Sequence, residues 1–281
     1  MIAICTNPYR DAELNLTFRV KEILSGLGYE SCVCPVFANP EEMTEGELPV
    51  ELFHIRDVLP ALTHAVVLGG DGTILAVVRQ ILGTQIPILG VNLGTKGFMT
   101  ALETDELDRI PEAFREDAKI STRMMLRISL LREGESIISD CALNDVVIHG
   151  YGECISPTAW ADGNKMFSFS GDGLIIATPT GSTGYSMSAG GPIVEPDARA
   201  ILLTPICAHT LTAKPYVLPP DRRVRVLTEK LTGRRAYLAV DGYPVADLES
   251  GDLLEIETAG ETVRMIELSS RSFYEQLEKL V

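Results

Sequence analysis

Two hydrophobic patterns alternate along the first 116 residues of the chain. Short runs of consecutive apolar residues, many of them β-branched, are typical of buried strands in a parallel sheet. These runs occupy residues 1–5, 29–36, 65–68 and 86–92. Between them, apolar residues recur at helical spacing over residues 13–27, 73–82 and about 106–114. We predict that Gly28 ends the first helix and that the acidic, breaker-rich segment 39–49 is an exposed loop. The alternation of strand and helix predicts a Rossmann-like α/β domain over residues 1–117.

After about residue 117 the pattern changes to short strand-like runs separated by Gly or Asp. The runs read MLRISLLR, SIISDCALNDVVIHG, FSFSGDGLIIATP, RVRVLT, AYLAVDG, DLLEIETA and VRMIEL. Because no long helical pattern interrupts them, residues 118–268 are predicted to form a β-rich second domain. Helical spacing returns in SFYEQLEKLV, which predicts a C-terminal helix within residues 269–281.

Composition narrows the class of protein. The formal net charge of −15 argues against nucleic acid or an anionic membrane as a partner. No apolar run approaches the ~18 residues of a membrane span, and the N-terminus MIAICTNPYR lacks the pattern of a signal peptide. The six cysteines form no CxxC pair, and the four histidines are scattered. We therefore expect a cytoplasmic protein whose cysteines are small buried residues, neither zinc ligands nor disulfides.

The segment HAVVLGGDG at 64–72 places a carboxylate inside a glycine loop. A strand, a glycine loop and a helix N-terminus together form a phosphate cradle, in which backbone N–H groups converge on the ligand. The predicted phosphate loop consists of Gly69, Gly70, Gly72 and Thr73, with Thr73 as the expected helix N-cap. Asp71 would repel an anion there unless it holds a metal or accepts a proton. The alternative is an ordinary turn, since Gly-Gly and Asp-Gly are common turn dipeptides.

A second glycine-rich stretch, GDGLIIATPTGSTGYSMSAGGP at 171–192, is dense in short hydroxyl side chains. These suit hydrogen bonds to a ribose, base or phosphate, and Tyr185 offers a flat surface for stacking. The alternative is a Ser/Thr-rich turn that caps a helix. Asn144 and Asp145 lie in the strand-like run ALNDVVI, where a buried amide and carboxylate need partners. The pair could instead form a turn at the end of a strand.

Four motifs together resemble the ATP-dependent NAD kinases in order and spacing. They are GGDGT at 69–73, NxGxxGF at 92–98, LNDVVI at 143–148 and DGLIIATPTGSTGYSMSAGGPI at 172–193. GGDG alone is shared with diacylglycerol and sphingosine kinases and with 6-phosphofructokinases, whereas the long block is much more specific. The resemblance implies a Rossmann-like N-terminal domain, a β-rich C-terminal domain, NAD bound between them, and a C-terminal helix that packs on the first domain.

By motif, the resemblance implies that Asp71 is the catalytic carboxylate. The residues implied to bind NAD are Asp71, Gly72, Phe98, Asn144, Asp145, Asp172, Thr183, Gly184, Tyr185 and Ser188. Gly184 replaces the alanine usual in the family, and Tyr243 replaces the glutamine of its DGQ motif after Asp241 and Gly242. Residues 150–165 match no family pattern, so no role is transferred to them.

The implied reaction moves the γ-phosphoryl group of ATP to the 2′-hydroxyl of the adenosine ribose of NAD, forming NADP. A carboxylate that orients the hydroxyl and accepts its proton late contributes ~10²–10⁴-fold, and Mg²⁺ or another divalent cation would screen the phosphates. The metal ligands stay unassigned. Two alternatives remain open, a lipid kinase that shares GGDGT and a non-catalytic dinucleotide sensor. The resemblance also implies a homodimer or homotetramer. The use of NADH, and of polyphosphate in place of ATP, stays open.

Overall fold

The structure is a computed structural model that describes residues 1–43, 50–94, 97–228, 231–268 and 272–278. The chain divides into two compact units. Unit 1 contains residues 1–122 and 263–281, and unit 2 contains residues 123–262. Over the described residues, no helix has both the length and the apolar character needed to cross a membrane. The predicted domain boundaries after residues 117 and 268 stay predictions.

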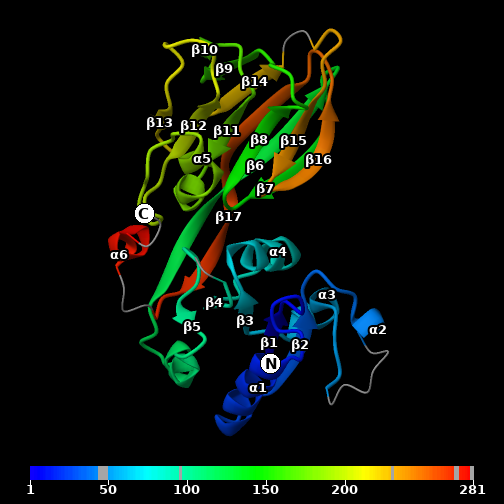
Figure 1. The fold of residues 1–281 in the computed structure, drawn as a ribbon, viewed down its shortest axis with the longest axis vertical. Coiled ribbons are helices and arrows are strands. Elements are labelled where there is room, and N and C mark those ends of the chain that lie inside the picture. Colours follow the sequence, from blue (N-terminus) through cyan, green and yellow to red (C-terminus); the bar gives the residue numbers. More distant parts are fainter. Residues whose placement is uncertain (44–49, 95–96, 229–230, 269–271, 279–281) are drawn as a thin grey trace. The chain divides into compact units, whose positions relative to one another are not determined.

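Unit 1 is built on a parallel sheet in which β1 lies between β2 and β3 (Figure 1). Its strands are β1 (Ile2–Thr6), β2 (Ser31–Pro35), β3 (His64–Gly69), β4 (Ile88–Asn92) and β5 (Leu102–Glu103). The order β2-β1-β3-β4 continues with β5 against one end of β4, and Met265 pairs with Ile88 at the other end. All residues of β1 and β4 are buried, as the continuous apolar runs predict.

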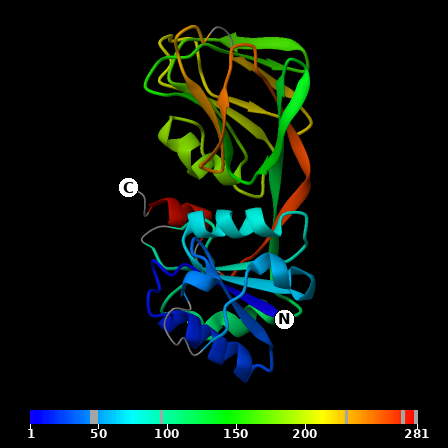
Figure 2. The ribbon, with the colours of Figure 1, turned by 90° about the vertical axis from the view of Figure 1, so that its right-hand side faces the viewer.

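Helices cover both faces of this sheet, with α4 on one face and α1 on the other (Figure 2). The helical segments are α1 (Asn15–Gly26), α2 (Pro40–Met43), α3 (Ile55–Val58), η1 (Leu59–Ala61), α4 (Asp71–Ile81) and η2 (Leu107–Phe114). Gly28 adopts a left-handed φ of 81° two residues after α1, which agrees with its predicted role as a terminator.

Three expectations in unit 1 are wrong in detail. Segment 39–49 is not simply an exposed loop, because Pro40 is buried at the start of the helical turn α2; residues 44–49 lie outside the described residues. Segment 107–114 is a 3₁₀-helix and not an α-helix, in which the ring of Pro111 would clash with the carbonyl of Leu107. Thr73 is not the N-cap of α4, which begins two residues earlier at Asp71.

Unit 2 contains two antiparallel sheets. One includes β10 (Asn164–Ser168), β9 (Pro157–Ala161), β14 (Val224–Thr228), β17 (Leu253–Ile266), β6 (Ile120–Arg132) and β7 (Glu135–Ala142). The start of β6 (120–122) and the end of β17 (263–266) belong to unit 1. The other has the order β13-β12-β11-β8-β15-β16. Its strands are β13 (Tyr216–Leu218), β12 (Ile201–Ile206), β11 (Gly173–Ala177), β8 (Asp145–Gly150), β15 (Ala236–Val240) and β16 (Tyr243–Leu248).

The two sheets of unit 2 share one hydrophobic core. Alternate residues of β6, such as Leu126 and Ile128, are fully buried with Ile148, Leu174 and Leu203 of the other sheet. Two short helical segments, η3 (Thr180–Thr183) and α5 (Tyr185–Ser188), follow β11. The predicted fold class, an α/β domain and a β-rich domain, is therefore confirmed.

The C-terminal segment belongs to unit 1. Its last described element is α6 (Phe273–Glu278), and the predicted helical residues 279–281 lie outside the described residues. The Phe273 ring lies 6.4 Å, centroid to centroid, from the ring of Phe98. The backbone before α6 is also bound to unit 1, because the Arg109 guanidinium donates a hydrogen bond to the Leu268 carbonyl at 2.7 Å.

Candidate functional site

The Asp71 loop lies where the strand order of unit 1 reverses. β1 is flanked by β2 on one side and β3 on the other, so the carboxyl ends of β1 and β3 are neighbours. Open α/β sheets bind ligands at such a switch point. Asn7 follows β1 there, and its side-chain amide donates to the hydroxyl of Thr73 at 3.3 Å. Sequence reasoning missed Asn7, because a lone Asn after a strand carries no local signal.

The glycines of the loop have two different roles. A side chain on Gly69 would overlap the side chain of Thr73, so Gly69 is required for close packing. A Cβ on Gly70 or Gly72 would meet nothing within 4 Å. Gly70, in extended backbone, precedes α4 and has no side chain to cap it, and its carbonyl accepts the N–H groups of Thr73 and Ile74. The first turn of α4 therefore faces open space, which suits an anionic ligand.

The Asp71 carboxylate is held by backbone groups from the segment after β4. Oδ2 accepts the Phe98 N–H and Oδ1 accepts the Met99 N–H, both at 3.0 Å. Burial raises the pKa of Asp71, and the two N–H groups act in the opposite direction. A carboxylate with a raised pKa is a better proton acceptor, and each oxygen can still accept another hydrogen bond.

The NLGTKGF motif forms the segment to which Asp71 is bound. Asn92, at the end of β4, is buried; its amide donates to Glu103 at 2.9 Å and its Oδ1 accepts the Gly94 N–H at 2.9 Å. A Cβ on Gly97 would overlap Thr100, so this glycine also permits close packing. Residues 95–96 lie outside the described residues.

In unit 2, Asn144 lies in the turn between β7 and β8, and Asp145 is the first residue of β8. The pair is thus at a strand end, not inside a continuous strand as the apolar run suggested. The Oδ1 atom of Asn144 is buried and has no hydrogen-bond partner among the residues that the structure describes, which is costly unless a ligand supplies a donor. The Thr180 hydroxyl, one of the short hydroxyls of the second glycine-rich stretch, is also buried without a hydrogen-bond partner among the described residues, although it was not among the residues predicted to bind NAD.

The Asp145 side chain is a buried carboxyl beside a second acid. Burial raises the pKa of Asp145 to about 7, and the charge of Asp241 adds to the rise. The group therefore exchanges its proton near neutral pH. Such a perturbed acid beside an unpaired amide oxygen is typical of a binding site.

Most hydroxyls of the 171–192 stretch hold the fold together. The Thr178 hydroxyl donates to the Leu143 carbonyl at 2.5 Å, and the Ser182 hydroxyl bonds to both backbone groups of Val194. Ser186 and Thr204 are joined through their hydroxyls at 2.9 Å. For these side chains the structural interpretation applies rather than ligand binding.

Three of the predicted residues of unit 2, Asp145, Asp172 and Tyr185, lie beside β11. Asp172 directly precedes β11, whereas Asp145 pairs with Ala177 at its far end. Tyr185, 41% exposed at the start of α5, is close enough to both carboxylates for their charges to raise its pKa, although burial is the larger cause. A five-residue strand spans ~17 Å. Asp172 and Asp145 are therefore separated by about the length of the strand.

Thr183, Gly184 and Ser188 surround Tyr185 in sequence. The Thr183 hydroxyl donates to the Thr180 carbonyl at 3.3 Å, and Ser188 is exposed at the end of α5. Gly184 lies near the predicted pair, because a Cβ there would be 3.8 Å from Asn144 Nδ2 and 3.9 Å from Asp145 Oδ2. Interaction with Asp172 raises the pKa of the Cys207 thiol, so Cys207 is a neighbour of this predicted residue that sequence reasoning missed.

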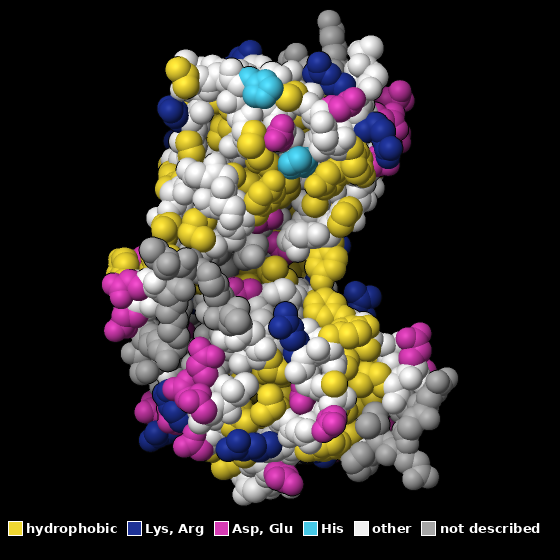
Figure 3. All heavy atoms as spheres, viewed as in Figure 1, with side chains coloured by type: hydrophobic (Ala, Val, Ile, Leu, Met, Phe, Trp, Pro, Cys, Tyr) yellow, Lys and Arg dark blue, Asp and Glu magenta, His cyan; other side chains and the backbone are white. Residues whose placement is uncertain are grey.

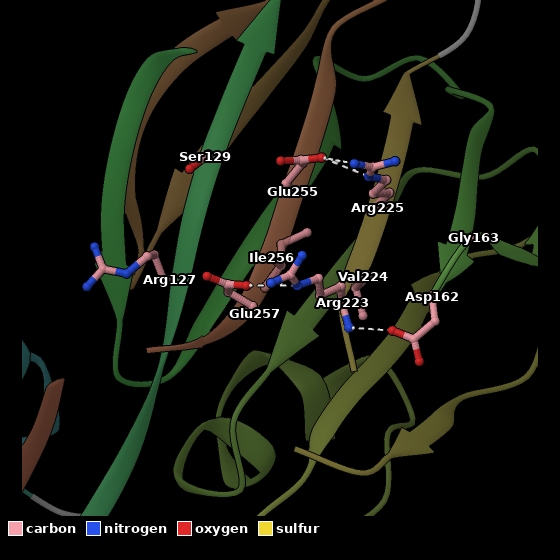
Figure 4. Close-up of a pocket in the computed structure, with 10 residues that line it drawn as sticks. All are labelled: Arg127, Ser129, Asp162, Gly163, Arg223, Val224, Arg225, Glu255, Ile256 and Glu257. Carbon is pink, nitrogen blue, oxygen red and sulfur yellow. Dashed lines mark hydrogen bonds and ion pairs between the residues drawn. The ribbon is translucent and has the colours of Figure 1, made fainter. Parts of the chain in front are cut away.

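A pocket of about 560 Å³ on the β6, β14 and β17 strands contains none of the predicted residues (Figure 4). Its charges are paired, for example Arg225 with Glu255 at 2.6 Å and Arg223 with Glu257 at 3.5 Å. On the face drawn in Figure 3, Lys and Arg side chains lie interspersed with Asp and Glu side chains. Within the described ranges, no three His, Cys, Asp or Glu side chains converge as a metal cage.

Two family models match most of the chain. The ATP-NAD kinase N-terminal domain matches residues 2–118, and the ATP-NAD kinase C-terminal domain matches residues 143–268. The chain belongs to the ATP-NAD kinase family. It is therefore an enzyme, a kinase that acts on NAD, and the lipid kinase and sensor alternatives are not favoured.

Relatives and solved structures of this family agree over nearly the whole chain. The chain is 34% identical to NAD kinase of Ruminiclostridium cellulolyticum, with 100% of the chain and 97% of the relative covered. NAD kinase of Geobacter sulfurreducens is 44% identical over 79% of this chain and 80% of its own. Yeast NADH kinase complexed with NADH superposes with a TM-score of 0.83 at 28% identity, over 99% of this chain and 85% of the other. An Archaeoglobus fulgidus NAD kinase in complex with ATP superposes with a TM-score of 0.76 at 25% identity, over 100% of this chain and 98% of the other.

Proposed function

We propose that this enzyme transfers the γ-phosphoryl group of ATP to the 2′-hydroxyl of the adenosine ribose of NAD, forming NADP. In such a transfer the protein mainly aligns the hydroxyl with the phosphorus and neutralises charge. The observation that carries the assignment is the Asp71 carboxylate at the open N-terminus of α4, between Gly70 and Gly72, which leave space beside the backbone.

Asp71 is the proposed catalytic residue. Its raised pKa favours acceptance of the proton as the ribose oxygen attacks phosphorus. The N–H groups of Phe98 and Met99 fix the orientation of the carboxylate and leave lone pairs for the hydroxyl. Phosphate oxygens would bind the N–H groups of the first turn of α4, where the helix dipole favours negative charge.

The dinucleotide is proposed to bind the groups beside β11. Asn144 Oδ1, which has no partner over the described ranges, would accept a hydrogen bond from a donor group of NAD. The Asp145 carboxylate would accept a hydrogen bond from a ribose hydroxyl, and the exposed ring of Tyr185 would stack on a base. The remaining predicted contacts come from Gly72, Phe98, Asp172, Thr183, Gly184 and Ser188.

Magnesium is proposed to enter as part of the substrate Mg·ATP. Mg²⁺ usually keeps several waters and binds through phosphates and one or two carboxylates, so it needs no all-protein cage. This fits the described residues, which form no such cage. Localisation in the cytoplasm and assembly as a homodimer or homotetramer stay predictions.

The decisive experiment is an assay of the purified chain with Mg·ATP and NAD, in which NADP is read by an NADP-specific dehydrogenase. Parallel reactions replace NAD by NADH, by diacylglycerol or by sphingosine, and ATP by polyphosphate. We expect NADP to form with NAD and no phosphorylation of either lipid. NAD binding by calorimetry without any NADP would favour a sensor, and lipid phosphorylation would favour a lipid kinase; either result would overturn the proposal.

A further inference from the structure

The side chain of Asp241 is bound to the backbone of the turn that carries Asn144 and Asp145. Its Oδ2 accepts the Leu143 N–H at 2.8 Å, and its Oδ1 accepts the N–H groups of Asn144 at 2.7 Å and Asp145 at 3.1 Å. In return, the Asp241 N–H donates to the Asp145 carbonyl at 2.9 Å. One carboxylate thus satisfies three consecutive backbone donors, an arrangement of strong, charge-assisted bonds.

The opposite side of the same turn is held by the segment after β11. The Thr178 N–H donates to the Asn144 carbonyl at 2.9 Å, and its hydroxyl donates to the Leu143 carbonyl at 2.5 Å. The backbone of the turn is therefore fixed from both sides. None of these bonds uses the Asn144 Oδ1 atom, which is buried and has no hydrogen-bond partner in the described part of the chain.

We infer that Asp241 is a positioning residue for dinucleotide binding, which holds the 143–145 turn so that the Asn144 and Asp145 side chains are presented to NAD. The inference rests on the proposed role of these two side chains. Preorganisation of this kind increases affinity, because the cost of ordering the turn is met when the chain folds.

The position of Asp241 in the chain supports this role. Asp241 and Gly242 form the two-residue turn between β15 and β16, with φ of 49° and 82°. Asn and Asp both tolerate this left-handed conformation. Replacing Asp241 by Asn therefore preserves the hairpin and alters the carboxylate alone. The new amide would present N–H groups to a cluster of N–H donors, so at least one of the three bonds is lost.

A matched hairpin turn provides the control. Asp162 and Gly163 join β9 to β10 with φ of 48° and 80°. The Asp162 carboxylate also accepts a backbone N–H, that of Arg223 at 3.0 Å, and an Arg222 guanidinium N–H at 2.8 Å. Asp162→Asn removes the same chemistry from a turn that carries no predicted binding residue.

The test is calorimetric NAD binding to the full chain without ATP, from pH 6 to pH 8.5. We expect Asp241→Asn to weaken NAD binding by about 10- to 100-fold, the scale of one lost charge-assisted hydrogen bond. Asn144→Ala is expected to weaken binding, and Asp162→Asn to leave it unchanged. Among the described residues, the titratable groups that interact with the Asp145 carboxyl are those of Asp241 and Tyr185. NAD affinity is expected to rise with pH as the Asp145 carboxyl ionises. Because the Asp241 charge raises the pKa of Asp145, this rise in affinity should occur at lower pH in Asp241→Asn.

Two results would overturn the inference. The first is an Asp241→Asn variant that has lower thermal stability but binds NAD with unchanged affinity and unchanged pH dependence, while Asn144→Ala binds NAD more weakly. If Asn144→Ala also binds NAD normally, the proposed role of the turn fails, and the inference fails with it. The second needs no variant: in the wild-type chain without NAD, rapid hydrogen exchange of the 143–145 amides would show that the turn is not held. Slow exchange is expected.

Discussion

At the scale of single residues, Asp71 is the strictest test of the chemistry. Asp71→Asn keeps the shape of the side chain, but the amide is no longer a base and cannot accept N–H bonds from both Phe98 and Met99. We expect kcat to fall by ~10²-fold or more while NAD binding survives. The measurement is steady-state NADP formation together with calorimetry of NAD.

Asp57→Asn is the matched control, because Asp57 is an exposed acid in the first turn of the short helix α3. It should retain wild-type kcat. An Asp71→Asn enzyme that turns over at nearly the wild-type rate would show that the carboxylate is not the proton acceptor.

The Asp145 carboxyl predicts a pH dependence of both stability and binding. Its pKa of about 7 in the folded chain lies above the ordinary value of 3.8. Its contribution to folding stability is therefore complete below about pH 3.8 and is lost as the pH rises through about 7. If the ionised form accepts a ribose hydroxyl, NAD affinity should rise over the upper part of the same range, with proton release on binding near pH 7.

Thermal melts and calorimetry in two buffers of different ionisation enthalpy would measure both effects. In Asp145→Asn, the melting temperature should depend less on pH and NAD binding should release no proton. A wild-type affinity that is constant from pH 6 to pH 8 would contradict the assignment.

The sequence predicted those site residues whose immediate neighbours in the chain form a recognisable pattern. Asp71 could be identified from sequence because a strand-like apolar run and three glycines surround it. The Asn144–Asp145 pair could be identified because these polar residues interrupt an apolar run. Asn7 and the Asp241 contacts could not be predicted in this way. The bonds from Asp241 span 96 to 98 residues of sequence, so only the folded chain shows what this carboxylate binds.

At the scale of elements, Gly181 joins η3 to the 143–145 turn. A Cβ at this position would lie less than 3.0 Å from the backbone O, C and Cα atoms of Asn144. Since backbone atoms cannot move aside as a flexible side chain can, Gly181→Ala should force η3 and the turn apart. We expect a loss of ~1–3 kcal/mol in the free energy of unfolding, the scale of overpacking, together with weaker NAD binding.

Gly260→Ala offers the comparison within unit 2, because a Cβ there meets nothing within 4 Å. Its melting temperature and NAD affinity should stay close to those of the wild type. Equal stability of the two variants in denaturant titrations would show that the close approach at Gly181 can relax without cost.

Elements with strong periodicity were predictable, and elements with conflicting local signals were not. The strands of unit 1 follow continuous apolar runs, and most strands of unit 2 follow alternation. The hairpin of β9 and β10 was not predicted from the 150–165 segment, although Asp162-Gly163 is a typical hairpin signal. β12 contains Pro205, which argues against a central strand. The structure accommodates it because the pairing of β12 with β13 ends at Leu203.

At the scale of the whole molecule, unit 1 is discontinuous in sequence, and this predicts how fragments behave. Residues 263–281 supply Met265, which pairs with Ile88 of β4, and Phe273, which contacts Phe98. They also supply Glu267, whose carboxylate lies 2.6 Å from the Lys119 ammonium. A fragment of residues 1–122 leaves one edge of β4 and part of an apolar core exposed, because Ile266 belongs to that core.

We expect the 1–122 fragment to melt at a lower temperature and over a broader range than a chain in which a short Gly/Ser linker joins residue 122 to residue 263. The comparison uses circular dichroism melts of both proteins at equal concentration. Burial of Ile266 and Met265 alone is worth ~1.5–3 kcal/mol for each side chain, and ~1 kcal/mol shifts the melting temperature of a domain of this size by several degrees. Identical melts would show that the returning segment adds no stability to unit 1.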